Sequence, residues 1–227
     1  MTEIRATLID SMGDDLTVVN AARVSFGKKS ELECTDMTVG TYQLKKSDVG
    51  LIKYLAKHKH TSPFGHAFAS FHVKAPIFVA RQLVKHKFLR WNEISRRYVD
   101  DEPEFYTPIV WRGKAENKKQ GSSNEEINTA YYDRDDGYAT YEGDAYSISL
   151  ESYQKMLAIG VAPEQARMVL PQSMMTEWWW SGSLDAFADM CNLRLKPDSQ
   201  YETQLVARDI DKEMSKLFPV AWDELVS

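Results

Sequence analysis

The most constraining feature is the stretch from residue 67 to residue 88, where the spacing of apolar side chains changes from that of a strand to that of a helix. Residues 67–74 (AFASFHVK) alternate apolar and polar side chains, which is typical of a half-buried strand. Pro76 suits the first turn of a helix, and an apolar side then follows at helical spacing over residues 77–88. A chain with both patterns in succession is expected to be of the mixed α/β (α+β) class.

Weaker patterns predict further elements of both kinds. Asp14 or Asp15 is expected to cap a helix. The three consecutive tryptophans from Trp178 to Trp180 would cover all sides of a helix, which indicates core or subunit contact, or a stacking surface for a flavin. We expect a strand over 4–9, a polar loop over 27–48 and helices over 14–22, 47–55, 147–159, 163–170, 184–190 and 200–217.

Residues 112–146 differ in composition from the rest of the chain. They are rich in Gly, Ser, Asn, Asp and Tyr and poor in aliphatic side chains. This composition predicts a polar surface excursion of low order, inserted into one domain that spans residues 1–227. No internal repeat is present.

The composition argues against several classes of protein. No stretch of the 227 residues approaches the ~20 apolar residues of a membrane span, and the N-terminus lacks the pattern of a signal peptide. Cys34 and Cys191 are too few for a disulfide framework and fit a reducing, cytoplasmic environment. The formal net charge of −5 argues against nucleic-acid binding, although it allows a local basic pocket for a small anion.

The densest chemical signal is the basic stretch 81–98, RQLVKHKFLRWNEISRRY. It holds six Lys and Arg residues and one acid, Glu93, in a chain whose net charge is negative. Arg81 and Lys85 are four apart and would share a helical face, and the polar residues Asn92 to Ser95 are expected to form a turn beyond it. Such a helix end suits a phosphate group, because guanidinium, ammonium and backbone N–H groups converge on its oxygens. The alternative is a solvated basic face.

Other candidate chemistry is weaker. Four of the five histidines lie between residues 58 and 72, but their spacing matches no zinc pattern, so we predict no metal site. Ser95 as a nucleophile with His86 as its base is an alternative that lacks a G-x-S-x-G turn. Cys191 is expected to be a core thiol. Neither a dinucleotide-binding glycine motif nor a P-loop occurs.

Several motifs together indicate a family. Lys85-His86-Lys87 is followed after seven residues by Ser95, within the run NEISRRY. The segments AARVSF, HTSPF, FHVKAPIFVARQ, ARMVLP and NLR accompany it, from about residue 10 to about residue 205. In type and order these motifs resemble the flavin-dependent thymidylate synthases, whose signature is Arg-His-Arg, seven residues and Ser.

The resemblance implies an activity, cofactors and an assembly. Enzymes of that family methylate dUMP to dTMP, with 5,10-methylenetetrahydrofolate as the carbon donor and FAD, reduced by NADPH, as the hydride donor. They are homotetramers whose active sites lie at subunit interfaces. Each chain folds as a twisted, mainly antiparallel sheet flanked by helices.

The resemblance also implies which residues form the site. Catalytic roles would fall to Arg194, His60 and Ser95, with Arg194 at the pyrimidine. The nucleotide would be held by Gln82, Lys85, Glu93, Ser95, Arg97, Arg167 and Arg194. Of these, Gln82, Ser95, Arg97 and Arg167 would chiefly hold its phosphate. The flavin would be held by Ser25, Ser62, Lys85, His86, Lys87, Asn92 and Glu93, with His60 beside it.

Departures from the family pattern keep two alternatives open. Lys85 and Lys87 replace arginines, which keeps the charge but loses the planar, bidentate fork. Asp185 places an acid where a ligand of the flavin phosphate is expected. The alternatives are an enzyme of the same fold that methylates or hydroxymethylates dCMP, and a nucleotide-binding homologue without catalysis. Arg194 only donates hydrogen bonds, which favours the O4 acceptor of uracil over the N4 donor of cytosine.

Overall fold

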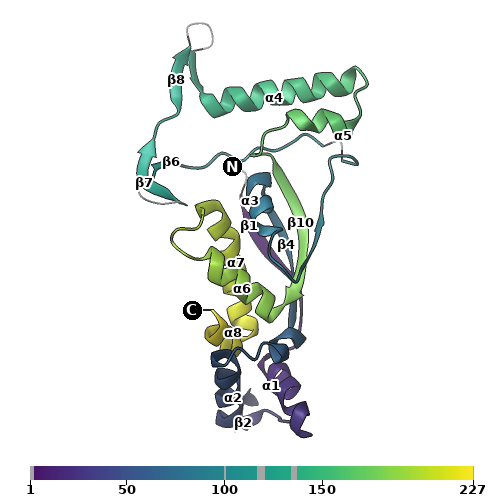
Figure 1. Ribbon diagram of the computed structural model, residues 1–227, viewed down its shortest axis with the longest axis vertical. Coiled ribbons are helices and arrows are strands. Elements are labelled where there is room, and N and C mark those ends of the chain that lie inside the picture. Colours follow the sequence, from purple (N-terminus) through teal and green to yellow (C-terminus); the bar gives the residue numbers. More distant parts are fainter. Residues whose placement is uncertain (1–2, 100, 117–120, 134–136, 227) are drawn as a thin grey trace.

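The core of the fold is a four-stranded antiparallel sheet. The computed structural model describes residues 3–99, 101–116, 121–133 and 137–226. The strand order β1-β4-β10-β5 brings distant parts of the chain side by side (Figure 1). With the helices around it, this sheet confirms the predicted mixed fold class. Its strands are β1 (Arg5–Met12), β4 (Phe68–Pro76), β10 (Met175–Ser183) and β5 (Leu89–Glu93).

The tryptophan run lies in strand β10, so the prediction of a helix there is wrong. Trp178 and Trp180 are each 1% exposed, whereas Trp179 between them is 46% exposed. A strand imposes this alternation because successive side chains point to opposite faces. Trp178 also stacks on Trp91 of β5, with ring centroids 4.3 Å apart. Aromatic side chains favour such pleated, half-buried positions.

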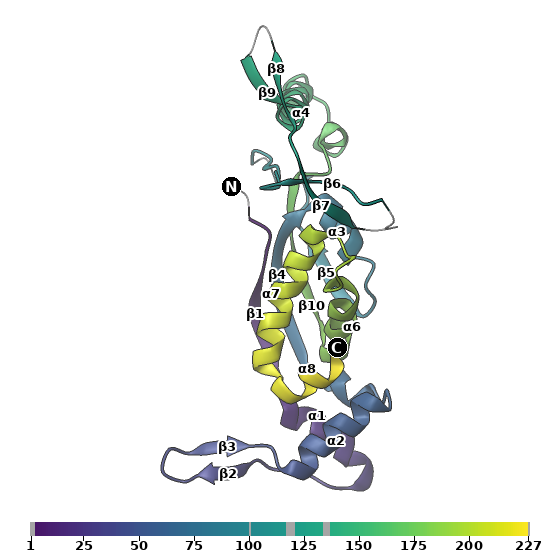
Figure 2. The same ribbon diagram turned by 90° about the vertical axis from the view of Figure 1, so that its left-hand side faces the viewer.

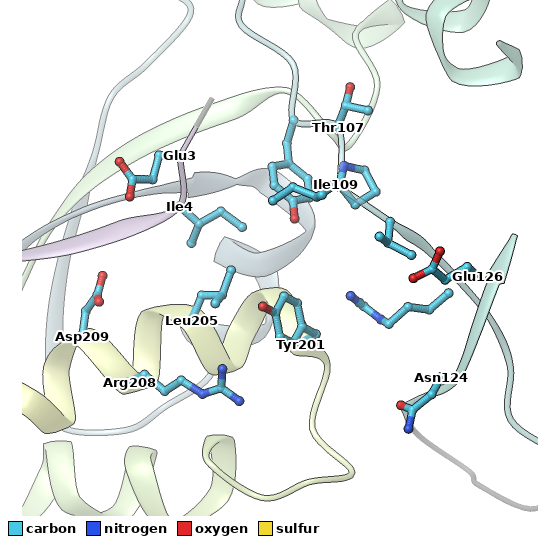
Figure 3. A pocket seen from close by; sticks show the side chains of 14 residues that line it. Glu3, Ile4, Thr107, Ile109, Asn124, Glu126, Tyr201, Leu205, Arg208 and Asp209 are labelled. Atoms are coloured by element: carbon cyan, nitrogen blue, oxygen red, sulfur yellow. The ribbon is translucent and has the colours of Figure 1, made fainter. Parts of the chain in front are cut away.

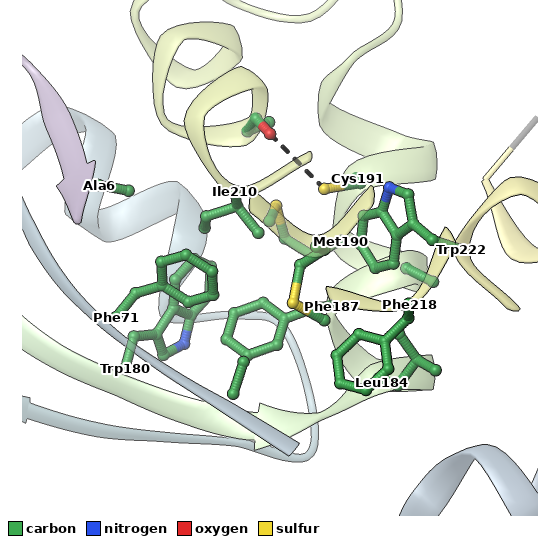
Figure 4. Close-up of a cluster of buried hydrophobic side chains, with 14 of the residues drawn as sticks. Ala6, Phe71, Trp180, Leu184, Phe187, Met190, Cys191, Ile210, Phe218 and Trp222 are labelled. Carbon is green, nitrogen blue, oxygen red and sulfur yellow. Dashed lines mark hydrogen bonds between the residues drawn. The ribbon is translucent and has the colours of Figure 1, made fainter. Parts of the chain in front are cut away.

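Helices α6 and α7 cover one face of the sheet, and α8 packs against both of them (Figure 2). Helix α7 presents its apolar side to β1 and β4, because its buried residues recur at helical spacing. Phe187 of α6 lies edge-on to both Phe71 and Trp180 in the core (Figure 4). The three helices are α6 (Leu184–Arg194), α7 (Tyr201–Leu217) and α8 (Pro219–Leu225).

Cys191 lies within this core, as predicted. Its thiol is fully buried and donates to the carbonyl oxygen of Ala207 at 3.7 Å. Burial raises the pKa of the Cys191 thiol well above its ordinary value. A thiolate nucleophile is therefore disfavoured at this position.

One end of the molecule is built from the N-terminal helices and a hairpin. Asp14 caps α1 as predicted: its carboxylate accepts from the backbone N–H of Thr17 at 2.8 Å. The prediction of a loop over 27–48 is wrong in part, because β2 and β3 pair as a hairpin there (Figure 2). These short strands are exposed and polar, so they lack an apolar alternation. The elements are α1 (Asp15–Arg23), η1 (Val24–Phe26), β2 (Glu33–Asp36), β3 (Thr41–Gln43), α2 (Lys46–Lys57) and η2 (Ser62–His66).

The basic stretch forms a short helix and a strand, not one helix with a polar turn. Helix α3 (Ile77–Leu83) ends before Lys85, so Arg81 and Lys85 do not share a helical face as predicted. Phe88 has a φ of 66°, which turns the chain into β5. Asn92 and Glu93 then lie opposite Trp179 and Trp178 in the sheet.

The opposite end holds most of residues 112–146, and the prediction of low order there is wrong for the described part. Two hairpins pair β6 with β7 and β8 with β9, followed by the long helix α4 (Figure 1). Within the described residues, no helix is both long and apolar enough to span a membrane. The elements are β6 (Trp111–Lys114), β7 (Ser122–Ile127), β8 (Ala130–Asp133), β9 (Gly137–Thr140), α4 (Tyr141–Ala158), α5 (Pro163–Ala166) and η3 (Arg167–Val169).

Candidate functional site

A cationic cavity of about 580 Å³ gathers part of the predicted nucleotide site. Three predicted residues line it: Gln82 from the end of α3, Lys85 just beyond that helix and Arg194 from the last turn of α6. Among the described residues that line it, three are cations and none is a carboxylate. The cavity is therefore suited to an anion. Its other lining residues are Arg112, Gly121, Ser122, Gln200 and Tyr201.

Gln82 is held at the cavity wall by the start of α7. Its side-chain amide donates to the side-chain oxygen of Gln200, and its own oxygen accepts from the Thr203 hydroxyl at 3.3 Å. Thr203 is fully buried. The Gln82 amide is thus oriented by its neighbours and can offer a defined donor to a ligand.

Arg194 and His86 form the most perturbed titratable pair near this cavity. The Arg194 guanidinium donates from Nε to His86 Nε2 at 2.9 Å and from Nη2 to the Gln82 carbonyl oxygen at 3.1 Å. Burial and, secondly, the Arg194 charge lower the pKa of His86 to about 4. Burial also lowers the pKa of Arg194. His86 is consequently neutral at physiological pH and serves as an acceptor that orients Arg194.

Glu93, Ser95 and Arg97 lie apart from this cavity, around the end of β5. Glu93 accepts from the hydroxyl of Thr176 at 2.7 Å and from the indole N–H of Trp91 at 3.1 Å. The Ser95 hydroxyl accepts from the backbone N–H and from Nε of Arg97, each at 3.3 Å. The structure therefore places these residues together, but not on the wall formed by Gln82 and Arg194.

Four further predicted residues lie at the two ends of the molecule, near α5 and near α1 (Figure 1). Arg167 begins η3 beyond α5, is exposed and donates from Nε to the Glu164 carbonyl oxygen at 3.3 Å. Ser25 in η1 and Ser62 in η2 are exposed and flank α1 at the other end, with His60 just before η2. Within one chain, the predicted site residues therefore lie in separate groups.

A larger cavity of about 890 Å³ adjoins the cationic one and shares Arg112 and Tyr201 with it. Figure 3 shows Arg208 and Leu205 of α7 facing it beside Tyr201, with Ile4 on the opposite side. The Arg208 guanidinium lies 5.6 Å from the centre of the Tyr201 ring. This cavity is more apolar in its lining than the cationic one.

The comparisons with known proteins settle the family. The model of the thymidylate synthase complementing proteins matches residues 7–220. The chain belongs to this family.

Flavin-dependent thymidylate synthases are among its relatives, which confirms the resemblance. One from Thermus thermophilus is 39% identical over 218 residues, covering 95% of this chain and 73% of the relative. One from Thermosipho melanesiensis is 36% identical over 220 residues, covering 96% and 89%. A solved structure of the UMP/dUMP methylase PolB from Streptomyces cacaoi, bound with 5-Br dUMP, is similar with a TM-score of 0.76 and 30% identity, covering 99% of this chain and 95% of that one.

Relatives of this chain are named flavin-dependent thymidylate synthases, and the residues present here suit a flavin. Lys85 and Lys87 are exposed cations that suit its pyrophosphate, and Phe88 offers a planar surface that is 85% exposed. The Asp185 carboxylate, which departs from the family pattern, accepts a hydrogen bond from the Ser183 hydroxyl within the first turn of α6. The donor set fits the group. No three His, Cys, Asp or Glu side chains of the described part of the chain gather to hold a metal ion.

Sequence reasoning missed the part of the cavity wall that is formed by Arg112, Gly121, Ser122, Gln200 and Tyr201. The sequence predicts a surface excursion for Arg112, and for Gln200 and Tyr201 only the start of a helix. The available signal was the Arg112 charge beside Trp111, in a segment otherwise poor in apolar residues. That signal does not reveal a contact with residues about 90 positions later in the chain.

Proposed function

We propose that this chain catalyses the reductive methylation of dUMP to dTMP, as a flavin-dependent thymidylate synthase. The observation that carries the proposal is the cationic cavity in which Gln82, Lys85 and Arg194 converge, in a chain of this family. The PolB methylase, which acts on UMP and dUMP and is 30% identical, supports a uridine nucleotide as the substrate.

Arg194 provides the electrostatic contribution at the pyrimidine. Its guanidinium is oriented by His86 and by the Gln82 carbonyl oxygen, so it is preorganised before the substrate arrives. A positive charge at a carbonyl oxygen of the ring stabilises electron density that develops there during the reaction. Because arginine has donors only, it favours uracil over cytosine.

The flavin would be held by the exposed cations and the polar residues around β5 and η2. We assign it to Ser25, Ser62, Lys85, His86, Lys87, Asn92 and Glu93. Glu93 is already oriented by Thr176 and Trp91, and His86 by Arg194. When bound, FAD supplies the hydride that it receives from NADPH, and 5,10-methylenetetrahydrofolate supplies the carbon.

We further propose that the active form is a homotetramer with sites shared between subunits. Ser25 and Ser62 belong to the proposed site together with Arg167 but lie at the opposite end of the molecule from it (Figure 1), so copies of the chain must bring them together. Large exposed apolar side chains accompany them: Phe26 is 79% exposed and Met168 is 75% exposed. Such side chains are suited to subunit contacts. Cysteine usage supports a cytoplasmic location, and the extent of the family match supports one domain.

The test is the purified chain with FAD, NADPH, 5,10-methylenetetrahydrofolate and either dUMP or dCMP at low oxygen. We expect flavin absorbance that bleaches with NADPH, returns on addition of the substrates and accompanies dTMP formation. Formation of a methylated or hydroxymethylated cytosine nucleotide from dCMP would show that dCMP, and not dUMP, is the substrate. Nucleotide binding without turnover, even with added FAD, would favour the homologue without catalysis.

A further inference from the structure

Arg112 is the cation of the cavity wall that no family motif accounts for. It lies in β6, at the start of the 112–146 segment, and lines the cationic cavity together with Gln82, Lys85 and Arg194. It also lines the two neighbouring cavities, of about 890 and 440 Å³. The guanidinium therefore stands where the cavities meet.

The Arg112 guanidinium is held in a fixed orientation. Its Nη2 donates to Glu202 Oε1 at 2.7 Å, its Nε donates to the Ser122 hydroxyl at 2.8 Å, and it stacks over the Tyr201 ring at 4.7 Å. Glu202 is only 4% exposed, and its second oxygen has no hydrogen-bond partner among the described residues. The Nη1 group of Arg112 makes no hydrogen bond within the described part of the chain, so the guanidinium keeps donors for a ligand.

Gly121 explains how the segment is brought to this wall. Its φ is +88°, and a Cβ there would lie 3.3 Å from the backbone oxygen of Asp198. The backbone at Gly121 therefore fits closely against the loop that precedes α7. Ser122 and Arg112 thereby line the same cavity as Gln82.

We infer that Arg112 binds the 5′-phosphate of the nucleotide substrate, an assignment that rests on the proposed function. Uracil is neutral and needs only one or two donors, which Arg194 can supply. The Glu202 carboxylate compensates the Arg112 charge in part, but Lys85 and Arg194 leave the cavity lining positive. Together with the remaining donors of Arg112, this lining matches a phosphate dianion better than a neutral ring. A guanidinium fixed by a buried carboxylate presents its planar fork at little entropic cost. The opposing interpretation is a structural ion pair that only fastens the segment to α7.

The experiment compares two ligands that differ only in the phosphate. Binding of dUMP and of deoxyuridine to the FAD-loaded protein is measured by calorimetry or by competition. For Arg112→Gln we expect dUMP affinity to fall roughly tenfold or more, as for a lost charge-assisted hydrogen bond, with deoxyuridine affinity unchanged. Arg112→Lys should recover part of the dUMP affinity because it restores the charge.

Two further variants separate phosphate binding from support of the fold. Arg112→Gln leaves the Glu202 carboxylate buried without its partner, so the double variant Arg112→Gln/Glu202→Gln is measured as well and should show the same ligand contrast. Arg208→Gln is the matched control: Arg208 lies over the same Tyr201 ring but does not line the cationic cavity. Its dUMP affinity should stay within about twofold of the parent.

The outcomes distinguish the two proposals. Equal losses for dUMP and deoxyuridine, or no loss for either, would overturn the assignment of Arg112. If Arg112→Gln weakens the binding of dUMP but not of deoxyuridine, and the parent protein forms no dTMP, the Arg112 assignment stands and the proposed catalysis fails. If the parent does not bind dUMP in the presence of FAD, both proposals fail.

Discussion

Arg194 donates from Nε to Nε2 of His86 at 2.9 Å, which joins the last turn of α6 to the turn after α3 across 108 positions of sequence. The bond requires an unprotonated Nε2, and the lowered pKa of His86 satisfies that requirement. Family resemblance assigns His86 to the flavin and Arg194 to the pyrimidine. Their contact implies that the two proposed binding sites share one hydrogen-bonded element.

Stability is expected to depend on His86 at acid pH. Its pKa falls from the usual 6.5 to about 4 in the folded chain. Between these pH values His86 is protonated in the unfolded chain but stays neutral in the folded chain. The free energy of unfolding should therefore decrease by roughly 1–2 kcal/mol as pH falls through this window, since the ring is only half-buried.

The measurement is urea denaturation at a series of pH values. His86→Gln is the comparison, because its amide oxygen still accepts from Arg194 but does not titrate. The variant should lose this part of the pH dependence. The same slope for both proteins between pH 6.5 and about 4 would show that His86 is not the responsible group.

Arg194→Ala is expected to abolish turnover while the flavin stays bound. Loss of the preorganised charge at the pyrimidine should lower dTMP formation by roughly 100-fold or more. Flavin occupancy, followed by visible absorbance, should remain near that of the parent. Release of the flavin by this substitution would contradict the assignment of Arg194 to the pyrimidine.

The double variant Lys85→Arg/Lys87→Arg is expected to keep or raise flavin affinity. Both lysines are exposed, so the larger guanidinium can be accommodated, and it adds a planar fork for the pyrophosphate. Fluorescence titration with FAD measures the effect, with the two single variants alongside. A clear drop in affinity would mean that the lysines are specifically adapted to this site.

The core around Phe187 should be a main source of stability. Phe187 is fully buried between Phe71 and Trp180. Phe187→Ala is expected to lower the free energy of unfolding by about 3–5 kcal/mol, because it removes apolar contacts and leaves a cavity. Phe187→Leu keeps most of the volume and should cost less than about 1.5 kcal/mol. Similar costs for both in denaturant titrations would argue against tight packing there.

The sequence by itself determined those features that depend on neighbours a few residues away. Alternation over residues 67–74 identified β4, helical spacing identified α6 and α7, and Asp14 capped α1 as expected. It also identified the family, because the motifs around Ser95 keep their spacing along the chain. Backbone preferences and caps act within one or two turns, so they are readable from short windows.

Only the tertiary structure decided the secondary structure of segments whose pattern fits both a helix and a strand. It also decided which residues far apart in the sequence are in contact. Three consecutive tryptophans fit a helix or a strand, and pairing of β10 between β4 and β5 selected the strand. Arg112 and Glu202 are 90 positions apart, and Gln82 and Gln200 are 118 apart. The sequence around one residue of such a pair contains no pattern from which the other residue can be predicted. The cationic cavity arises only once the sheet and α7 bring them together, because its charges act through space and not along the chain.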